Sequence, residues 1–470
     1  MKHNFIFLLF FLTSLGFAQE MDSTLVVIDS TVIDSVELKF DKNSLQNTRA
    51  LVALYERLYQ LEQTKSGKVN VVHIGDSHIQ ADLFTAQMRS KMQAVFGNAG
   101  FGFTFPYSVA KTNNSAPIQF SATGNFQSVR NLYADVLRPV GLSGIALEPS
   151  SAEFSIQMEI KDAQYHFTHL KLITPQNTSS FAVSLEQKNT TIITKVPKRV
   201  IHKIKPGEVL GGIADRYNVS LKALKKANGL KSDLIRDGKI LAIPTRSTQP
   251  KKSTKTTFIP IELSETVLSH DYASKQPLNK ITLIPNPDSN AFALNGLILC
   301  NNAPGITYSG IGVNGAKCSD YNKFPLFYEQ LPALQPDLIV ISLGTNESFD
   351  KQSGEAYFSQ LDQMIAAVKA KIPMATILVT TPPPSVLHRK YTNTFIADYA
   401  LKIKENAPAK GYAVWDLFEV FGGNKNIFNN AAKGLMARDK VHYSKTGYEK
   451  QADLFFEAFL QSYETYKSTK

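Results

Sequence analysis

The sequence predicts an α/β protein whose parallel sheet is interrupted by a β-sandwich, which itself carries a small βααβ unit. Strand-like and helix-like segments alternate near the N-terminus and again after residue 304, as in parallel sheets covered by helices. Short alternating apolar runs separated by turn residues fill most of 119–303, which is typical of an antiparallel sandwich. Within that region, 201–244 reads as strand, helix, helix and strand.

Length and composition describe an ordinary globular protein. The chain has 470 residues, of which 43% are hydrophobic and 19% charged, and this length suits two or three domains. We expect these segments: signal peptide 1–18, spacer 19–46, first core part 47–118, first sandwich part 119–200, βααβ unit 201–244, second sandwich part 245–303 and second core part 304–470.

The first 18 residues have a basic start, an apolar middle and a small-residue end, which predicts a secretory signal cut after Ala18. No later stretch approaches the roughly 20 apolar residues of a membrane span. We therefore expect an exported protein, periplasmic or associated with the cell wall, without stable membrane insertion. Cys300 and Cys318 are the two cysteines, and their spacing leaves both a disulfide and free thiols open.

The positive charge is concentrated in one segment. Between Lys195 and Lys255 there are 16 Lys and Arg against 4 Asp and Glu, whereas the rest of the chain has 35 against 36. This indicates an anionic partner, although basic linkers and a solvated face account for part of the excess. Nothing in the pattern favours a nucleic acid as that partner.

The core elements follow from apolar periodicity and from the residues that interrupt it. A helix is expected at 50–63, where leucines recur at helical spacing and Gly67 follows. The later core is expected to contain strands at 337–343, 376–380 and 412–415 and helices at 356–369, 395–404 and 448–463.

The sandwich strands are expected at 152–160, 165–173, 180–187, 190–196, 256–263, 279–285 and 292–300. His166 and His169 lie three apart in this region, which places them on opposite faces of a strand and argues against a metal site. We expect no metal and no cofactor.

Ser77 occupies the most informative position in the chain. It follows a run rich in β-branched residues at 68–75 and precedes a helical pattern at 80–96. Such a turn places the hydroxyl at the mouth of the sheet, and a helix N-terminus favours negative charge beside it. The position suits a nucleophile, although serine is also a common helix N-cap.

The second half of the chain supplies partners for this serine. His442 can accept its proton, and Asp439, three residues earlier, can orient the imidazole. Asn346 follows a buried strand directly, so its amide can donate to a developing oxyanion, as can the backbone N–H of Gly315. Taken singly, these residues have ordinary interpretations, such as a histidine at a helix start or an asparagine in a turn.

Two rival interpretations concern nearby residues. Asp416 ends a strand and is either an alternative carboxylate or a helix cap. Residues 310–315 spell G-x-G-x-x-G, but no strong helix follows and no acid ends a second strand near 335, which argues against a dinucleotide site.

Together the core motifs resemble the SGNH (GDSL-type) hydrolases. The four signature motifs occur in the family's order: Gly75-Asp76-Ser77, Gly315, Gly344-x-Asn346 and Asp439-x-x-His442. The resemblance covers 47–118 and 304–470 and implies a three-layer α/β/α core. It also implies that Ser77 is the nucleophile, that Asp439 and His442 complete the triad, and that Ser77, Gly315 and Asn346 form the oxyanion hole.

Two positions depart from the family pattern. His78 replaces the Leu of GDSL, and Glu347 replaces the Asp of the GxND block. Neither position carries the chemistry. A β-sandwich that interrupts an SGNH core is similar to the carbohydrate-binding inserts of peptidoglycan O-acetylesterases.

The unit at 201–244 resembles a LysM domain along its whole length. The matching residues are Lys205-Pro206-Gly207-Glu208, Ile213-Ala214, Leu224, Asn228-Gly229 and Ile243-Pro244. The resemblance implies binding of N-acetylglucosamine-containing glycans such as peptidoglycan or chitin, through loops at 207–211 and 228–235. The candidate contacts are Gly207, Glu208, Asn228, Gly229 and Leu230; a stable module that no longer binds glycan is the alternative.

These inferences favour an exported serine esterase that removes O-acetyl groups from peptidoglycan through an acetyl-Ser77 intermediate. One alternative is an acetylesterase on another polysaccharide or a lipid acylhydrolase. Another is a wall-binding scaffold without activity. The sequence does not distinguish hydrolysis from acetyl transfer, the sugar position that is deacetylated, or the oligomeric state.

Overall fold

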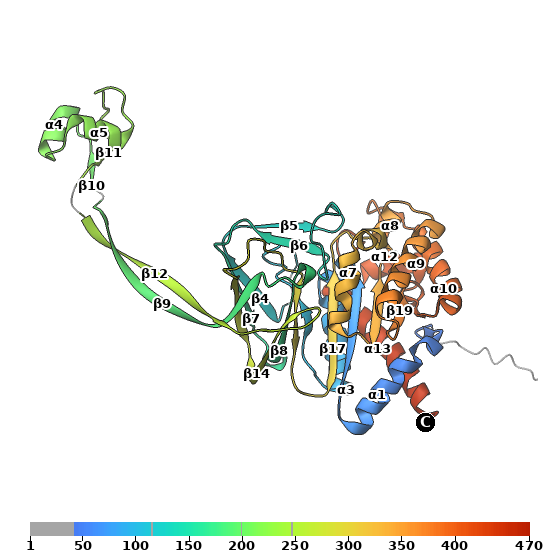
Figure 1. Cartoon of the computed structure of the whole chain (residues 1–470). Coiled ribbons are helices and arrows are strands. Elements are labelled where there is room, and N and C mark those ends of the chain that lie inside the picture. The colour runs from blue at the N-terminus through green and yellow to red at the C-terminus, as the bar shows by residue number, and fades with distance from the viewer. Residues whose placement is uncertain (1–41, 114–115, 199, 246–247) are drawn as a thin grey trace, which may run out of the picture. The chain divides into compact units, whose positions relative to one another are not determined.

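The computed structural model describes residues 42–113, 116–198, 200–245 and 248–470 (Figure 1). The predicted signal peptide and the predicted spacer up to residue 41 lie outside these ranges. Within the described ranges, none of the helices combines the length and the apolar character needed to cross a membrane.

The core contains a six-stranded sheet in the order β1-β22-β19-β18-β2-β17. Its strands are β1 Leu45–Gln46, β2 Lys68–Gly75, β17 Gly305–Gly312, β18 Leu338–Ser342, β19 Thr376–Thr380 and β22 Ala413–Trp415. The last five are parallel, as predicted, whereas β1 pairs antiparallel with β22. The sheet is therefore mixed at one edge, and β1 falls in the stretch predicted as a spacer because two residues are too few to produce a periodicity.

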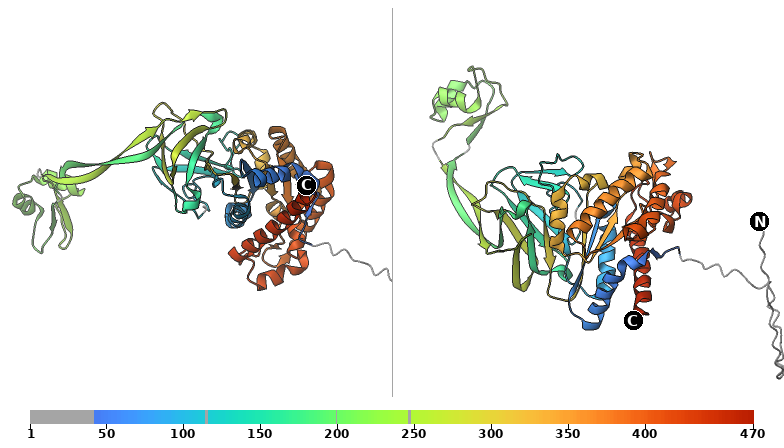
Figure 2. Two further views of the ribbon diagram at one scale, coloured as in Figure 1. Left: turned by 90° about the horizontal axis from the view of Figure 1, so that it is seen from below. Right: turned by 45° about the vertical axis from the view of Figure 1, so that its right-hand side comes forward.

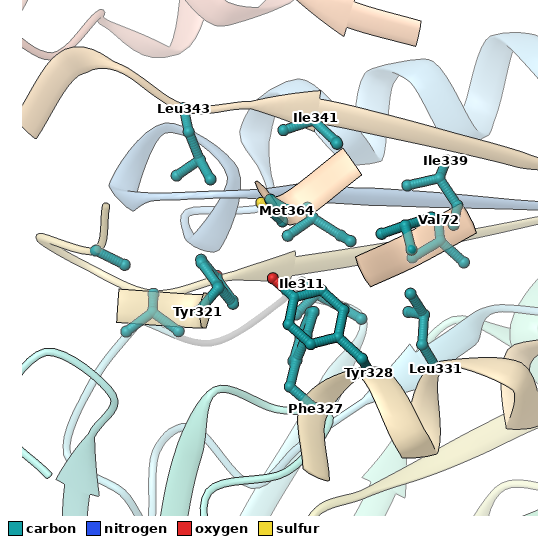
Figure 3. Packing of buried hydrophobic residues seen from close by; sticks show 14 of the residues in the cluster. Val72, Ile311, Tyr321, Phe327, Tyr328, Leu331, Ile339, Ile341, Leu343 and Met364 are labelled. Atoms are coloured by element: carbon teal, nitrogen blue, oxygen red, sulfur yellow. The ribbon is translucent and has the colours of Figure 1, made fainter. Parts of the chain in front are cut away.

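Alternate residues of the buried strands contribute to two separate apolar clusters, because successive side chains of a strand point to opposite faces. Val72 and Ile74 belong to a cluster with α9 (Gly354–Lys371) and α10 (Phe395–Lys410). Figure 3 shows part of it, where Val72 and Ile339 lie near the side chains of α7 (Pro325–Gln330). Val69 and Val71 belong to the second cluster, with α1 (Val52–Thr64), α3 (Leu83–Phe96) and α13 (Lys445–Lys467).

One predicted helix is divided in two. The helix predicted at 80–96 corresponds to the last residue of α2 (Ser77–Gln80) and to the whole of α3, which begins only at Leu83. Asp82 between them has a φ of 52°, a left-handed conformation that ends one helix before the next begins. The other core helices differ from the prediction by a few residues at their ends. The remaining elements of the second half are α6 Cys318–Asn322, η4 Leu331–Leu334, α8 Thr345–Phe349, β20 Val386–Leu387, β21 Tyr391–Thr392, α11 Leu417–Val420 and α12 Gly423–Ala432.

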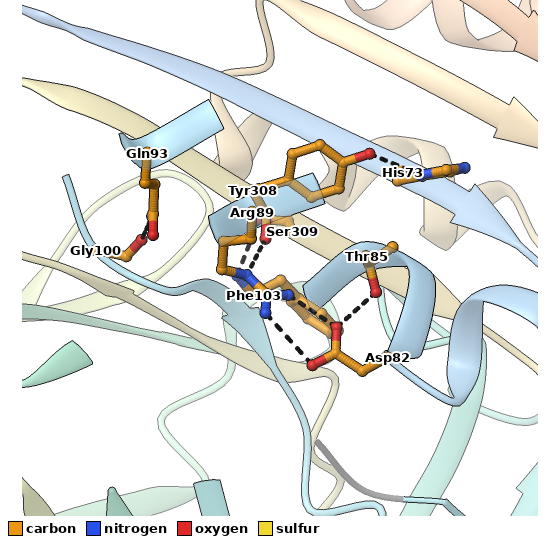
Figure 4. A network of polar contacts seen from close by, with 9 residues as sticks. All are labelled: His73, Asp82, Thr85, Arg89, Gln93, Gly100, Phe103, Tyr308 and Ser309. Carbon is orange, nitrogen blue, oxygen red and sulfur yellow. Dashed lines mark hydrogen bonds and ion pairs between the residues drawn. The ribbon is translucent and has the colours of Figure 1, made fainter. Parts of the chain in front are cut away.

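A buried ion pair explains why Asp82 is held in that conformation (Figure 4). The guanidinium of Arg89, only 1% exposed, lies 2.9 Å from the Asp82 carboxylate. Its Nε donates to the carbonyl of Tyr308 at 2.9 Å. The phenol of Tyr308 in turn lies 2.8 Å from Nδ1 of His73. The network joins α3 to β17 and to β2, the strand after which the candidate nucleophile Ser77 follows.

The inserted region forms two five-stranded antiparallel sheets (Figure 2). One has the order β12-β9-β15-β7-β4 and the other β13-β14-β8-β16-β3, and they enclose a third apolar cluster. The strands are β3 Gly102–Thr104, β4 Ile118–Thr123, β7 Ser155–Ile160, β8 Phe167–Ile173, β9 Phe181–Pro197, β12 Thr248–Ile261, β13 Ser264–Glu265, β14 His270–Leu278, β15 Lys280–Pro285 and β16 Gly296–Cys300. The short 3-10 turns η2 Ala163–Tyr165 and η3 Pro175–Asn177 flank β8.

The strands predicted at 180–187 and 190–196 are one continuous strand, β9, paired with β12 from Val183 and Ile261 to Pro197 and Thr248. The polar residues between the two predicted runs resemble a turn in sequence. Here their backbone groups are paired with β12, and mostly exposed side chains can remain polar in such a ribbon.

The module between β9 and β12 has the predicted order of elements: β10 Val200–Lys203, α4 Leu210–Arg216, α5 Leu221–Asn228 and β11 Ile240–Ile243. Leu210, Ile213, Leu224 and Leu241 form its own small apolar cluster. Outside this module, Cys300 and Cys318 are both free thiols, so no disulfide links them.

Candidate active site

Three candidate residues follow neighbouring strands of the core sheet. Strand β2 lies between β18 and β17, and all three are parallel. Ser77, Asn346 and Gly315 follow the carboxyl ends of β2, β18 and β17, so they meet at the same edge of the sheet. Residues far apart in sequence are thereby brought together by the strand order.

The turn after β2 requires glycine. A Cβ on Gly75 would lie 2.8 Å from the carbonyl oxygen of Ser342 and 2.3 Å from Cγ1 of Ile79. Such contacts exclude any side chain at this position without a shift of the strands. Asp76 then caps α2, where its Oδ1 accepts the backbone N–H of His78 at 2.9 Å. The chain therefore turns sharply enough to present Ser77 at the first helical position.

Ser77, His442 and Asp439 form a hydrogen-bonded chain. The Ser77 Oγ lies 2.8 Å from His442 Nε2, and His442 Nδ1 lies 2.8 Å from Asp439 Oδ2. With the ring proton on Nδ1 and donated to Asp439, Nε2 accepts from the serine hydroxyl. This is the arrangement in which an imidazole takes a proton from a nucleophile.

The loop before α13 fixes Asp439. Its Oδ1 accepts the backbone N–H groups of Val441 and His442 at 2.9 and 3.0 Å. Partial burial of Asp439 by itself raises its pKa, but the hydrogen bonds from the His442 ring and from these two N–H groups lower the pKa below its ordinary value. Asp439 therefore stays ionised and can stabilise a positively charged imidazole.

Asn346 and Gly315 lie in the same open cleft as Ser77 and His442, whose volume is about 560 Å³. Gly315 has a φ of 87°, a left-handed conformation that glycine adopts without strain. The amide nitrogen of Asn346 donates to the carbonyl of Ala316 at 2.9 Å and to Asp76 Oδ2 at 3.2 Å. Both amide protons thus have acceptors inside the protein, and donation to a substrate oxygen requires Asn346 to exchange or share one of them.

Two buried carboxyl groups, those of Asp76 and Glu347, lie next to Asn346: Asp76 accepts a hydrogen bond from its amide, and Glu347 follows it in sequence. Burial raises the pKa of Asp76 to about 7, with a further contribution from the charge of Glu347. Burial likewise raises the pKa of Glu347 to about 7, against an opposing hydrogen bond from the backbone N–H of Cys318. Both groups are 1% exposed, so neither reaches substrate directly.

His78, at the position of the Leu in GDSL, lies beside the triad. Its ring centre is 5.3 Å from that of His442, and its Nδ1 lies 2.8 Å from the hydroxyl of Tyr448. Burial lowers the pKa of His78 to about 3, so the ring stays neutral. It packs against the triad without adding a charge to it.

The carboxylate of Asp416 binds residues outside the triad. Its Oδ1 accepts the backbone N–H of Glu419 at 3.2 Å, which caps α11, and its Oδ2 pairs with Lys404. The interpretation of Asp416 as a cap agrees with these contacts.

The cleft also contains three residues of the insert that the sequence analysis did not single out. Arg130, Leu132 and Tyr133 come from the end of β5 (Phe126–Arg130) and the loop that leads towards β6 (Ile145–Pro149). No local pattern marks them, because their proximity to Ser77 depends on how the insert packs on the core.

In the 201–244 module, the side chains of Glu208 and Asn228 bind their own domain. The Glu208 carboxylate accepts from the Lys205 backbone N–H at 2.9 Å, from His202 and from Arg216, and these contacts lower its pKa to about 2. Asn228 donates to the Leu224 and Ala242 carbonyls and accepts the Ala242 N–H.

The predicted glycan contacts at Gly207, Glu208, Asn228, Gly229 and Leu230 stay a prediction. The exposed apolar residues of these two loops are instead Val209, 68% exposed, and Leu234, 87% exposed.

Comparison with known proteins identifies two domains. A model described as the GDSL-like lipase/acylhydrolase family matches 293–450, which includes Gly315, Asn346, Asp439 and His442 but not Ser77. A LysM domain model matches 202–244. A search of curated proteins found no match to the sequence.

Solved structures resemble the chain over different lengths. A structure described as "Peptidoglycan O-acetylesterase in action, 5 min" covers 89% of this chain and 99% of its own, with a TM-score of 0.57 and 18% identity. A lipase/acylhydrolase from Enterococcus faecalis covers 33% of this chain and 75% of its own, with a TM-score of 0.27 and 22% identity. The first likeness extends over both the core and the insert and shows a shared fold.

Proposed function

Because the chain carries the GDSL-like acylhydrolase domain of a carboxylic ester hydrolase together with a LysM domain, we propose that it is an exported serine esterase that removes O-acetyl groups from cell-wall peptidoglycan. The observation that carries the proposal is the hydrogen-bonded chain from Ser77 through His442 to Asp439 in an open cleft. We further propose that the core has the three-layer α/β/α arrangement of SGNH hydrolases. The proposed domain bounds are those given above, except that β1 (Leu45–Gln46) belongs to the core sheet and β3 (Gly102–Thr104) to a sandwich sheet.

The first step forms an acetyl-enzyme. The Ser77 Oγ attacks the carbonyl carbon of the acetyl group while its proton moves to His442 Nε2, 2.8 Å away. Asp439 accepts from the opposite ring nitrogen and stabilises the charged imidazole. When the ester C–O bond breaks, the sugar oxygen takes the proton from His442 and leaves as an alcohol.

The negative charge that develops on the carbonyl oxygen needs donors at the sheet edge. The backbone N–H groups of Ser77 and Gly315 and the amide of Asn346 are the donors we assign. For Asn346 this means that the bond to Ala316 or to Asp76 weakens as the oxyanion forms. A single donor of this kind is worth about 3–4 kcal/mol of transition-state stabilisation.

The second step returns the enzyme to its starting state. A water molecule gives a proton to His442 and attacks the acetyl carbon, and the bond between that carbon and Ser77 Oγ breaks. The serine recovers its proton from His442 and acetate leaves. The chemistry uses the triad and the donors alone, so we assign it no metal or cofactor.

Three features support peptidoglycan as the substrate class. The LysM domain is a glycan-binding type of module, and its two candidate loops expose Val209 and Leu234, which suit the apolar face of a sugar. The segment that contains it carries the excess of basic residues, which suits an anionic wall. The structural neighbour described as a peptidoglycan O-acetylesterase shares the fold of both the core and the insert.

The test is acetate release from O-acetylated sacculi, measured against sacculi whose acetyl groups have been removed by mild base. The proposal expects release from the first and none from the second. If the protein cleaves an aryl acetate but leaves acetylated sacculi intact, it is an esterase for another polysaccharide or a lipid acylhydrolase. If it cleaves neither, it is a wall-binding scaffold.

A further inference from the structure

The inserted sandwich forms part of the catalytic cleft. At the end of β5, Arg130 donates from Nη1 to the backbone carbonyl of Asn314 at 2.8 Å, directly beside Gly315. Leu132 lies over that glycine, since a Cβ on Gly315 would be 3.3 Å from Leu132 Cδ1. The insert therefore reaches the residue that we assign to the oxyanion hole.

Arg130 has no carboxylate partner in this cleft among the residues that the structure describes. Among the described residues that line it, the guanidinium of Arg130 is the one side chain with a permanent charge, and no carboxylate faces it. Within the part of the chain that the structure describes, its guanidinium contacts the Asn314 carbonyl and the ring of Tyr133, whose centre is 5.1 Å away. By contrast, Arg138 in the following loop pairs with Glu148 at 2.8 Å.

The local fold does not need the Arg130 side chain for its own support. The Asn314 backbone N–H is held separately by Gln80 Oε1 at 2.6 Å. After β5, the Asn131 N–H donates to the Gly144 carbonyl at 3.0 Å, which closes the β5–β6 connection. Since a guanidinium has five N–H donors and is always charged, most of its binding capacity is left for a ligand.

We propose that Arg130 is a specificity-determining residue that binds a carboxylate of the acetylated glycan, with the face of Tyr133 beside the sugar ring. Tyr133 is 69% exposed, so its ring is available for contact with a ligand. This inference rests on the proposed function and adds to it that the enzyme selects acetyl groups carried close to a negative charge. In peptidoglycan that carboxylate comes either from the lactyl ether of muramic acid or from the stem peptide.

The experiment compares the whole protein with Arg130→Gln, Arg130→Lys and the control Arg138→Gln. Each is assayed on four acetyl esters: an aryl acetate, an O-acetylated chitooligosaccharide, O-acetylated glycan strands freed of stem peptides, and O-acetylated strands that retain them. Thermal unfolding is recorded for each variant, so that a folding defect is recognised separately.

We expect Arg130→Gln to lower kcat/KM on the carboxylate-bearing strands roughly ten- to hundredfold more than on the two neutral esters, mainly through KM. Arg130→Lys should recover part of the loss because it keeps the charge, and Arg138→Gln should behave as the parent does. Added salt should raise the KM on the strands more for the parent than for Arg130→Gln. The strands on which the loss appears identify the source of the carboxylate.

Equal losses on all four esters would contradict the inference and assign Arg130 a structural role. So would an unchanged kcat/KM on both kinds of strand. Failure of the proposed function itself is recognised separately, because then the parent protein already fails to release acetate from the strands while it cleaves the aryl acetate.

Discussion

In the catalytic core, the hydrogen bond between Ser77 and His442 joins residues 365 positions apart, whereas in the LysM domain His202 contacts Glu208 six positions away. The core site exists only when β2, β17, β18 and the loop before α13 are all assembled. The LysM domain closes its own apolar cluster within about one tenth of the chain. The difference implies that chemistry and wall binding are separable, and that damage to one leaves the other intact.

The substitution Ser77→Ala should separate catalysis from wall binding most strongly. Loss of the nucleophile in a triad lowers kcat by about 10⁶-fold, because the remaining groups cannot act without it. The side chain is small and lies at a turn, so the fold and the LysM domain are unaffected. Aryl acetate turnover should disappear while pull-down with insoluble sacculi stays at the parent level. A variant with substantial turnover would show that another group is the nucleophile.

Arg89→Ala should destabilise the core alone. Its pair with Asp82 is buried, and removal of one partner of such a pair costs about 3–5 kcal/mol. The chain's single tryptophan, Trp415, is fully buried in the core, so its fluorescence during urea unfolding reports this region and not the LysM domain. The control is Lys91→Ala, whose partly exposed pair with Asp453 is worth less than about 1 kcal/mol. Equal effects of the two substitutions would contradict a structural role for the buried pair.

Glu347→Gln should change how core stability depends on pH. Burial raises the pKa of Glu347 to about 7 from the ordinary value of 4.5, so the folded state binds a proton that the unfolded state has already lost. The protein therefore loses unfolding free energy as pH rises from about 4.5 to about 7. Gln cannot ionise, so the variant should gain stability relative to the parent across this window.

The same measurement distinguishes this group from its neighbours. Burial lowers the pKa of His73 and of His78 to about 3, and neutral histidines make stability rise with pH instead. The difference between the Glu347→Gln variant and the parent removes that common contribution. Asp76 ionises in the same window, and in the difference it leaves only the part of its pKa shift that the charge of Glu347 causes. A difference that does not vary between pH 4.5 and 7 would contradict the assignment.

Excision of the LysM domain should have the smallest effect on catalysis. Replacement of 201–244 by a short Gly/Ser linker is sterically simple, because Val200 lies opposite Ile243 and Pro197 opposite Thr248 in the paired strands. Turnover of a small soluble ester should stay within about twofold, and sacculus binding should fall by about tenfold or more as one of two contacts is lost. Unchanged binding would place the wall-binding surface elsewhere, and loss of ester turnover in a folded variant would show that the regions are coupled.

The features that the sequence predicted correctly are those that depend on residues close together in the chain. Local patterns were sufficient for the turn at Ser77, the spacing of Asp439 and His442, and the whole order of elements in the LysM domain. Local patterns failed where a strand is defined by its pairing with residues that are distant in the sequence. Strand β1 has only two residues, and β9 contains a polar stretch whose backbone is paired with β12.

Side-chain contacts were predicted less well than elements. The LysM candidates Glu208 and Asn228 were chosen from a resemblance, but their polar atoms are used within the domain. No local sequence pattern identified Arg130 and Tyr133, because their position in the cleft follows from the packing of the insert on the core. Sequence periodicity predicts the core strands after which the site residues follow, although not their order in the sheet. The loops of the insert reach the site by contacts that periodicity does not contain.

The most direct test of the account is covalent labelling of the parent protein with a serine-directed phosphonate, followed by peptide mapping. The account predicts one modified residue, Ser77, and loss of aryl acetate turnover in proportion to labelling. Labelling should vanish in Ser77→Ala and slow greatly in His442→Ala, because Nε2 of His442 is the base that activates the hydroxyl. Modification of another serine that parallels the loss of activity, or labelling of His442→Ala at the parent rate, would contradict it.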